Sequence, residues 1–259
     1  MKYILILLNR NFLILRKNIN MNLCLFFLFA PFLYLFIVSP LSNLFNSIMS
    51  SGMTYSYHAV PAVMFICTSI IALLIPIIIV NRDTKKNFLN YIFSTKVNPN
   101  IYFLSLIIFS LICSYLEFII SLFIAIQLSG AGSKLGLLIS SNQIIYFSIV
   151  IFTSILFFSN LGLLLSNFLK RLEYIIVSII FIFLIISFGS STFIPIDYYT
   201  PSFKSFIETY NIIFHLFDMF ISILKSDNIN LGTFIISILI SLTFYFLNII
   251  LFKKNGQKQ

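Results

Sequence analysis

Long apolar runs alternate with short polar segments along the whole chain. A transmembrane helix needs about 20 mostly apolar residues. Six stretches meet this requirement, and they are roughly Met21–Val38, Ala59–Val80, Ile101–Leu128, Ile144–Leu165, Leu172–Phe188 and Thr233–Phe252. Because an open strand in lipid would leave backbone groups unpaired, and because the alternation typical of a membrane barrel does not occur, these stretches predict helices. The pattern therefore predicts an all-α integral membrane protein with six transmembrane helices, in a single domain over residues 1–259.

The basic residues predict the orientation of these helices. Of the 16 Lys and Arg residues, only Lys134, Lys204 and Lys225 lie in the first, third and fifth connecting segments. All the others lie before the first helix, in the second and fourth connections, or after the last helix. Because Lys and Arg concentrate in cytoplasmic loops, we expect a multi-pass protein of the cell membrane with both termini in the cytoplasm.

The first 20 residues predict a further helix that lies along the membrane surface. Apolar residues recur at helical spacing among polar ones, and the apolar set is Ile4, Leu8, Phe12 and Leu15. A helix with one apolar and one basic face lies in the plane of the membrane interface. The apolar run Tyr3–Leu8 is too short for a signal peptide, and no cleavage motif follows it. We therefore expect a cytoplasmic interfacial helix over residues 1–20, with a plain basic flank as the alternative.

Composition narrows the possible functions. Hydrophobic residues make up 60% of the chain and charged residues only 9%, whereas soluble domains contain about 25% charged residues. The net charge of +9 comes from residues that flank the predicted helices, so it is no indication of nucleic-acid binding. Cys and His residues are scattered without metal-site spacing, and no catalytic or ATP-binding motif occurs. We expect no metal, no catalytic residue and no bound cofactor in this chain.

A polar stripe marks the connection between the fifth and sixth predicted helices. Polar residues recur there in steps of three and four, at Lys204, Glu208, Asn211, His215, Asp218 and Ser222. This spacing predicts one continuous amphipathic helix. A crossing here would place the C-terminus outside, so we expect the segment to dip into the outer leaflet or to lie on it. It either closes the bundle or contributes Asn211, His215 and Asp218 to a translocation path.

A second polar stripe lies within the third predicted helix, at Ser110, Ser114, Glu117 and Ser121. An ionisable side chain in lipid is costly and usually faces the interior of the bundle. Glu117 is either a neutral acid that is hydrogen-bonded to a neighbouring helix or part of a translocation path with Ser114 and Ser121. The sequence leaves both possibilities open.

Three segments resemble the ABC-2 family of transporter permeases. The first, Val60–Asn98, has a proline near the start of a span and a charged loop after the span. The second, Phe188–Asp197, is similar to the Gly-x-x-Phe-x-Pro element of the family. The third, Pro201–Asp218, has Tyr210-Asn211-Ile212 in the place of an Asn-Pro-Leu element. The resemblance extends over nearly the whole chain.

The resemblance implies a permease subunit that works with a separate cytoplasmic ATPase, which binds ATP and magnesium, and with a second permease chain, identical or related. It also implies that the loop after the second span forms a cytoplasmic coupling helix that contacts the ATPase. Asn87 and Lys96 hold the places of a glycine and a proline in this loop. The residues expected to make the contact are Arg82, Asp83, Lys85, Lys86, Phe88, Leu89, Ile92 and Phe93.

Between the fifth and sixth spans the resemblance implies a pair of re-entrant helices with a break near Tyr210-Asn211, where the polar spacing alone predicts one helix. Family members mostly export their cargo, so the resemblance implies an amphipathic, peptide, drug or lipid-linked substrate. The residues themselves leave two other functions open. One is a standalone membrane protein without an ATPase, such as an immunity factor or a channel, and the other is an intramembrane enzyme.

Overall fold

The computed structural model describes residues 2–17, 19–45, 55–89, 92, 98–129, 141–169, 171–224 and 231–256. Within these ranges all regular structure is helical, which confirms the predicted all-α membrane fold. The elements are α1 Lys2–Lys17, α2 Ile19–Leu33, η1 Tyr34–Val38, α3 Ser39–Phe45, α4 Ser56–Lys85, α6 Pro99–Ser129, α8 Ser141–Phe168, α9 Leu172–Ser187, η2 Ile196–Tyr198, α10 Pro201–Tyr210, α11 Ile212–Leu224 and α12 Leu231–Gly256.

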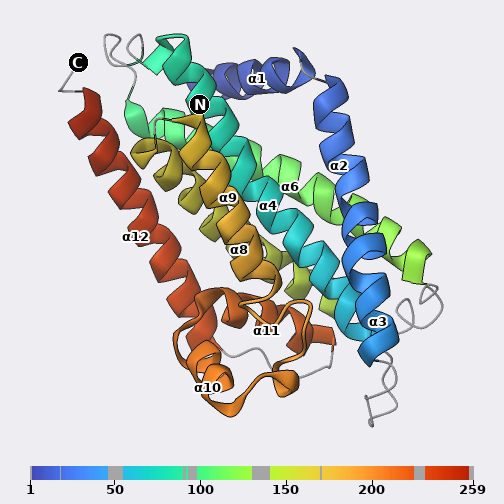
Figure 1. Ribbon diagram of the computed structural model, residues 1–259. Helices are drawn as coiled ribbons and strands as arrows, with labels where there is room; N and C mark the ends of the chain where they lie inside the picture. Colours follow the sequence, from blue (N-terminus) through green and yellow to red (C-terminus); the bar gives the residue numbers. More distant parts are fainter. Residues whose placement is uncertain are drawn as a thin grey trace.

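Helix α4 forms the centre of the bundle (Figure 1). In its most apolar stretch 89% of the residues are buried, against 22% in α12 and 17% in the first span. Its main neighbours are α6 and α8, and α12 packs against α8. A helix that is apolar on all sides is suited to such a central position, and the remaining helices expose apolar faces to the surroundings.

Among the described residues, five helices are long and apolar enough to cross a membrane, or six if the bent pair α10–α11 counts as one span; the five are Phe26–Phe45, His58–Lys85, Pro99–Ala125, Tyr146–Phe168 and Leu231–Phe252. The first extends beyond the predicted end at Val38, because η1 and α3 continue α2 without interruption. Pro31 removes a backbone donor inside α2, and the wider π-helical turn of η1 follows soon after it. Despite the proline, the backbone remains helical through Phe45.

The fifth predicted span corresponds to α9, which is a short helix. Its 16 residues correspond to about 24 Å at 1.5 Å per residue, whereas the hydrocarbon core of a bilayer is about 30 Å thick. The helix ends in a turn where the N–H groups of Phe188 and Gly189 both bond to the Leu184 carbonyl, at 2.9 and 3.3 Å. By length, α9 is shorter than a full crossing.

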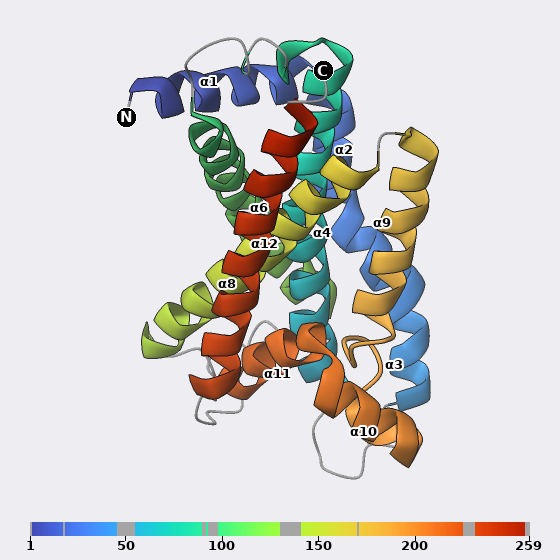
Figure 2. The ribbon, with the colours of Figure 1, turned by 90° about the vertical axis from the view of Figure 1, so that its left-hand side faces the viewer.

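Helices α10 and α11 form a bent pair at one end of the bundle (Figure 2). Their axes differ by 89°, and the break lies at Asn211, whose φ of −92° and ψ of 100° are extended. The continuous helix predicted from polar spacing is therefore wrong, and the break near Tyr210-Asn211 that the family resemblance implies is confirmed. A break of a single residue leaves the spacing of three and four almost intact, so periodicity did not reveal it.

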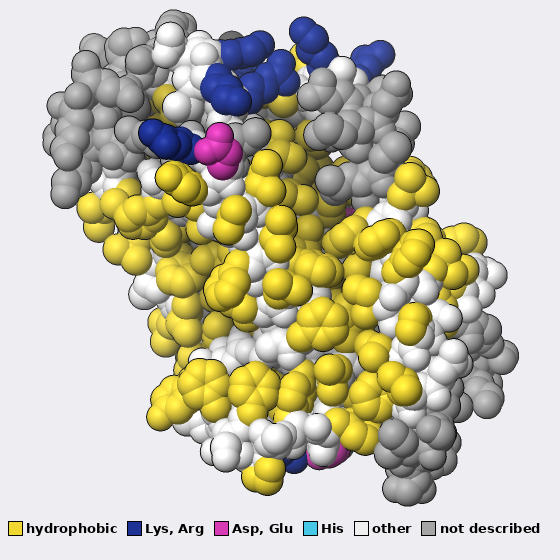
Figure 3. Space-filling model, in the orientation of Figure 1, with side chains coloured by type: hydrophobic (Ala, Val, Ile, Leu, Met, Phe, Trp, Pro, Cys, Tyr) yellow, Lys and Arg dark blue, Asp and Glu magenta, His cyan; other side chains and the backbone are white. Residues whose placement is uncertain are grey.

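Both termini lie at the same end of the bundle, where α1 lies across the other helices (Figures 1 and 2). Lys and Arg side chains gather at this basic end, and an apolar belt separates it from the opposite end (Figure 3). This arrangement suits a multi-pass membrane protein. That the basic end faces the cytoplasm stays a prediction.

A helix, α1, forms within the first 20 residues, as the sequence predicts, and part of its surface packs against the bundle. Leu7, Asn11 and Ile14 are buried, and α6 is the main neighbour of the helix. Of the predicted apolar set, Leu8 and Leu15 pack partly against the bundle, whereas Phe12 is 58% exposed. Apolar residues occur on most sides of this helix, so spacing alone did not identify the face that packs.

A side chain at Gly162 of α8 would overlap the backbone carbonyl of Leu73 on α4. Alanine favours a helix over glycine by about 1 kcal/mol, yet overpacking costs about 1–3 kcal/mol. We therefore predict that Gly162→Ala lowers the thermal unfolding temperature in detergent. Val177→Ile also adds one carbon, but on an exposed position of α9, and should have no effect. Equal effects of the two substitutions would contradict the close contact.

Candidate functional site

A buried carboxylate joins three helices at the basic end of the bundle. Asp83, near the C-terminal end of α4, is fully buried and forms an ion pair with Arg10 of α1. It also accepts a hydrogen bond of 2.8 Å from the Tyr102 hydroxyl of α6. The Arg10 guanidinium carbon lies 3.8 Å from the ring centroid of Phe88. Because a buried charge is stable only when it is paired and hydrogen-bonded, Asp83 fixes α1 and α6 relative to α4.

The chain turns sharply after α4. Asn87 has a φ of 53°, in the left-handed region that asparagine tolerates better than most residues, and it holds the place where the family resemblance expects glycine. The turn returns Phe88 and Leu89 to the bundle, where they and the buried Ile92 pack against the apolar cluster around Phe103. The backbone conformation at Asn87 therefore directs apolar side chains inward.

The expected ATPase-coupling residues divide into exposed and buried groups. Lys85 and Lys86 are exposed on the basic end. Arg82 is half-buried, and its guanidinium donates a hydrogen bond of 3.4 Å to the Ile14 carbonyl of α1. The other described members of the set point into the bundle, and Phe93 lies outside the described residues. Of the expected coupling residues, Lys85 and Lys86 are therefore the ones that a protein docking at this end would meet.

The polar stripe of the third predicted span lies in the seam between α4 and α6. Ser110, Ser114, Glu117 and Ser121 are all fully buried, and the Ser110 hydroxyl donates a hydrogen bond of 3.0 Å to the Ala72 carbonyl of α4. The carboxyl oxygens of Glu117 and the hydroxyl of Ser114 have no hydrogen-bond partner in the described part of the chain. These candidate path residues therefore lie inside a single subunit.

Asn211 holds the bent pair to the loop after α9. Its amide nitrogen donates hydrogen bonds to the Gly189 carbonyl at 2.7 Å and to the Ser190 hydroxyl at 3.0 Å. Its amide oxygen accepts from the backbone N–H groups of Ile213 and Phe214, at 2.9 and 3.3 Å. It is thus the N-cap of α11, and its polar atoms are engaged in structure.

The other polar residues of the stripe between the fifth and sixth predicted spans lie on two separate helices, α10 and α11. His215 is half-buried and Asp218 is exposed, both on α11. On α10, Lys204 forms ion pairs with Asp197 at 3.0 Å and with Glu208 at 4.0 Å. The break at Asn211 therefore divides the stripe, and the structure places these path candidates on a different element from the α4–α6 seam.

Two side chains at the N-terminal end of α4 hold the loop after α9, and sequence reasoning missed them. The Tyr55 hydroxyl donates a hydrogen bond of 2.6 Å to the Phe193 carbonyl, and His58 Nε2 lies 3.1 Å from the Ser191 carbonyl oxygen. Burial raises the pKa of Tyr55, so the phenol remains a neutral donor at physiological pH. Aromatic residues are common at the ends of membrane spans, so the position of Tyr55 did not indicate this contact.

Asparagines join α12 to α8. The Asn167 amide donates a hydrogen bond of 3.0 Å to the side-chain oxygen of Asn248, and the Asn248 amide donates one of 2.9 Å to the Asn160 carbonyl. Polar side chains can hold transmembrane helices together, because lipid provides no hydrophobic force between them. The signal for this contact was Asn248 itself, a polar residue inside the last apolar run.

Comparisons with known proteins agree with the resemblance seen in the sequence. The family model of the ABC-2 type transporter matches residues 2–225. This range includes the Asp83 junction, the α4–α6 seam and the bent pair. Neither the search of curated proteins nor the search of solved structures found a match. Among the described residues, no group of three or more His, Cys, Asp or Glu could hold a metal ion.

We predict that the stability of the protein depends strongly on each residue of the Asp83 junction. Asp83→Asn leaves Arg10 without its counter-charge, and breaking a buried pair costs about 3–5 kcal/mol. Tyr102→Phe removes one hydrogen bond to a charged group, worth about 1.5–3 kcal/mol. Thermal unfolding in detergent would measure both losses, with Tyr146→Phe at an exposed position as the control. Costs of Arg10→Gln and Asp83→Asn that simply add in the double variant would contradict the pairing.

The hydrogen bonds of Asn211 predict a graded effect of two substitutions. Asn211→Asp keeps the acceptor that caps α11 but loses the donors to Gly189 and Ser190, at about 1 kcal/mol each. Asn211→Ala loses the cap as well, for about 1 kcal/mol more. Asn98→Ala serves as the control, since Asn98 caps α6 through a single exposed bond to the Asn100 N–H. If Asn211→Ala destabilised the protein no more than Asn98→Ala, Asn211 would be only a helix cap.

Proposed function

The chain belongs to the ABC-2 type transporter family, and on this premise we propose that it is the membrane-spanning permease subunit of an exporter driven by a separate ATPase. Membership makes it a multi-pass membrane component of an ABC-type transporter. The ATPase partner, the second permease and the cargo belong to the proposal. One observation carries it: the exposed Lys85 and Lys86 stand directly on the junction that is buried around Asp83.

A displacement of the loop after α4 at the basic end would be transmitted to three helices at once. Helix α4 ends at Lys85, and Asp83 is bound to both Arg10 of α1 and Tyr102 of α6. In the proposed cycle the basic end lies in the cytoplasm, and the ATPase binds ATP and magnesium, closes, and moves the loop after Lys86. The junction would then carry α1, α4 and α6 together. ATP can shift the permease between two states only if the ATPase binds these states unequally.

Lys85 and Lys86 suit a docking contact because they are cationic and exposed and because the backbone that carries them is held in place. Lysine side chains reach outward on flexible stems, whereas the backbone beneath them is held by the Asp83 junction and by the turn at Asn87. Surface charges of this kind orient a partner and speed its association. In the proposal, the ATPase contact on this loop would therefore rest on a backbone that is held in place.

A second permease chain, identical or related, would complete the path. The path candidates Ser114, Glu117 and Ser121 are buried inside one subunit, so a cargo would have to pass elsewhere. Large apolar side chains are exposed on several helices, among them Phe36, at 68%, and Val177, at 64%. In the proposal, lipid covers some of these faces, and two permease chains enclose a path suited to an amphipathic, peptide, drug or lipid-linked cargo.

Gentle affinity purification of the full chain from its native membrane tests this function. We expect an ABC ATPase and a permease partner, a second copy or a related chain, to co-purify in stoichiometric amounts, with ATP hydrolysis in the purified complex. An active preparation that contains the chain and no ATPase would contradict the proposal and would favour a standalone membrane protein, such as an immunity factor or a channel.

Charge reversal at the docking contact provides the sharper test. We predict that Lys85→Glu combined with Lys86→Glu reduces the co-purified ATPase about tenfold, which corresponds to about 1.4 kcal/mol, without lowering the amount of chain in the membrane. Lys204→Glu reverses a charge at the opposite end and should leave the ATPase bound. Normal ATPase recovery with the double variant would remove Lys85 and Lys86 from the contact.

A further inference from the structure

Glu117 is an ionisable side chain to which the described part of the chain offers no charged partner. It is the only Asp, Glu, Lys, Arg or His residue in α6, and it lies about 27 Å beyond Pro99 along the helix, at 1.5 Å per residue. Its side chain is fully buried, and neither carboxyl oxygen has a hydrogen-bond partner among the described residues. The Asp83 carboxylate, by contrast, has both a cation and a hydroxyl.

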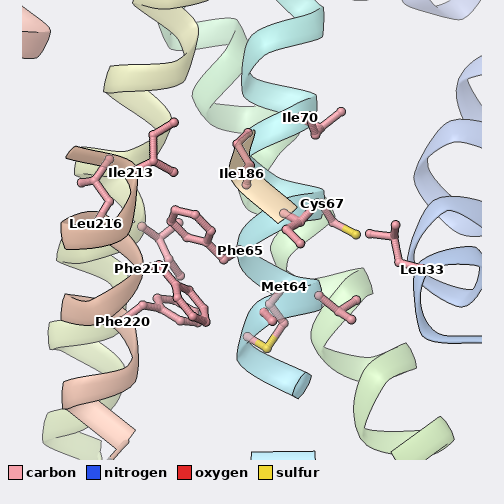
Figure 4. Packing of buried hydrophobic residues seen from close by; sticks show 14 of the residues in the cluster. Leu33, Met64, Phe65, Cys67, Ile70, Ile186, Ile213, Leu216, Phe217 and Phe220 are labelled. Carbon is pink, nitrogen blue, oxygen red and sulfur yellow. The ribbon is translucent and has the colours of Figure 1, made fainter. Parts of the chain in front are cut away.

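Among the described residues, no opposite charge reaches Glu117 from the helices packed against α6. Helix α4 contributes the Cys67 thiol, which interacts with the carboxyl group and points toward Leu33 of α2 (Figure 4). Helices α2 and α8 contain no Asp, Glu, Lys, Arg or His. Helix α1 and its cations, among them Arg16 and Lys17, lie at the basic end, where Arg10 is engaged with Asp83. The lysines of α12 lie in its last turn, at that same end. An ionised carboxylate without a counter-charge is strongly unfavourable in such surroundings.

The seam is also closed to larger ligands. Small side chains line the α6 face of the seam, at Ser110, Ser114 and Ser121, and small residues let helices approach closely in lipid. The bond from the Ser110 hydroxyl to the Ala72 carbonyl fixes this approach. A proton needs no space beyond the carboxyl group itself, whereas an ammonium group or a hydrated cation would have to separate the helices.

We propose that Glu117 is a proton-binding site in the α4–α6 seam, occupied while the seam is closed and emptied when the seam opens. Helices α4 and α6 are the two that the coupling loop joins, from Lys86 to Asn98. Movement of that loop therefore acts on the seam directly. This second part, ATP-driven opening, rests on the proposed function.

The step itself is a simple proton transfer. When the helices separate, water enters the seam, the O–H bond of the Glu117 carboxyl group breaks, and the proton passes to a water molecule. The carboxylate that remains is solvated by the same water. When the helices close again, the carboxylate takes a proton back and the water leaves.

Infrared spectroscopy of the full chain in lipid bilayers tests the resting state without any ATPase. We expect the C=O stretching band of a protonated carboxyl group at neutral pH, lost in Glu117→Gln and kept in Glu173→Gln, the matched change at an exposed position at the start of α9. Because glutamine is a neutral mimic of the protonated acid, Glu117→Gln should also unfold at the wild-type temperature. Identical spectra for the wild type and Glu117→Gln would overturn the proton site.

The same band, followed in the complex with its ATPase, tests the opening. Trapping the complex with ATP and vanadate should remove the signal of one carboxylic acid per chain in the wild type and cause no loss in Glu117→Gln. An unchanged band in a complex that hydrolyses ATP would overturn the release. A purified complex without an ATPase would overturn the proposed function and the ATP-driven release together, and the resting spectrum distinguishes that outcome from failure of the proton site.

Discussion

The close approach of α4 to α6 and α8 is the contact on which the rest of the bundle depends. In lipid, apolar surface gains little by leaving its solvent, so helices associate through tight packing and a few hydrogen bonds. Gly162 lets α8 lie against the backbone of α4 at Leu73, and the Ser110 hydroxyl bonds to the Ala72 carbonyl from the other side. At Ala72 and Leu73, α4 thus contacts α6 through a serine hydroxyl and α8 through a glycine, and both groups are smaller than a leucine side chain.

The central position of α4 also connects the two ends of the molecule. At the basic end, Asp83 binds α1 and α6. At the other end, Tyr55 and His58 hold the loop after α9, and Asn211 anchors the bent pair to that same loop. A displacement of α4 along its axis would therefore act on the bent pair of α10 and α11 through hydrogen bonds rather than through loose apolar contacts. Such a linkage is the physical basis for coupling between distant sites.

Hydropathy and the distribution of Lys and Arg were sufficient to predict the fold class and the shared end of the two termini, because both depend on properties summed over many residues. Features that depend on a single contact could not be predicted in this way. Nothing in the spacing of α1 shows that Asn11, rather than Phe12, is buried. The break at Asn211 was invisible to periodicity and was indicated only by the family resemblance, because one extended residue hardly disturbs the helical repeat.

The candidate site was predictable in position more than in role. The loop after α4 could be located, yet the burial of Asp83 depends on Arg10, which lies 73 residues before it in sequence. The inward turn of Phe88 depends on the backbone conformation of Asn87. Glu117 stood out because a charge is rare in an apolar run. Its lack of partners became visible only when the neighbouring helices were in place.

The short α9 has a consequence for the membrane itself. A helix of about 24 Å in a hydrocarbon core of about 30 Å leaves a hydrophobic mismatch, and lipid relieves such a mismatch by thinning next to the protein. The exposed face of α9, with Val177, Ile180 and Phe181, would be the place where the bilayer is drawn in. We expect the membrane around this subunit to be thinner on the side of α9 than beside the longer α12, so that the thickness of the surrounding lipid would exert a force on the molecule.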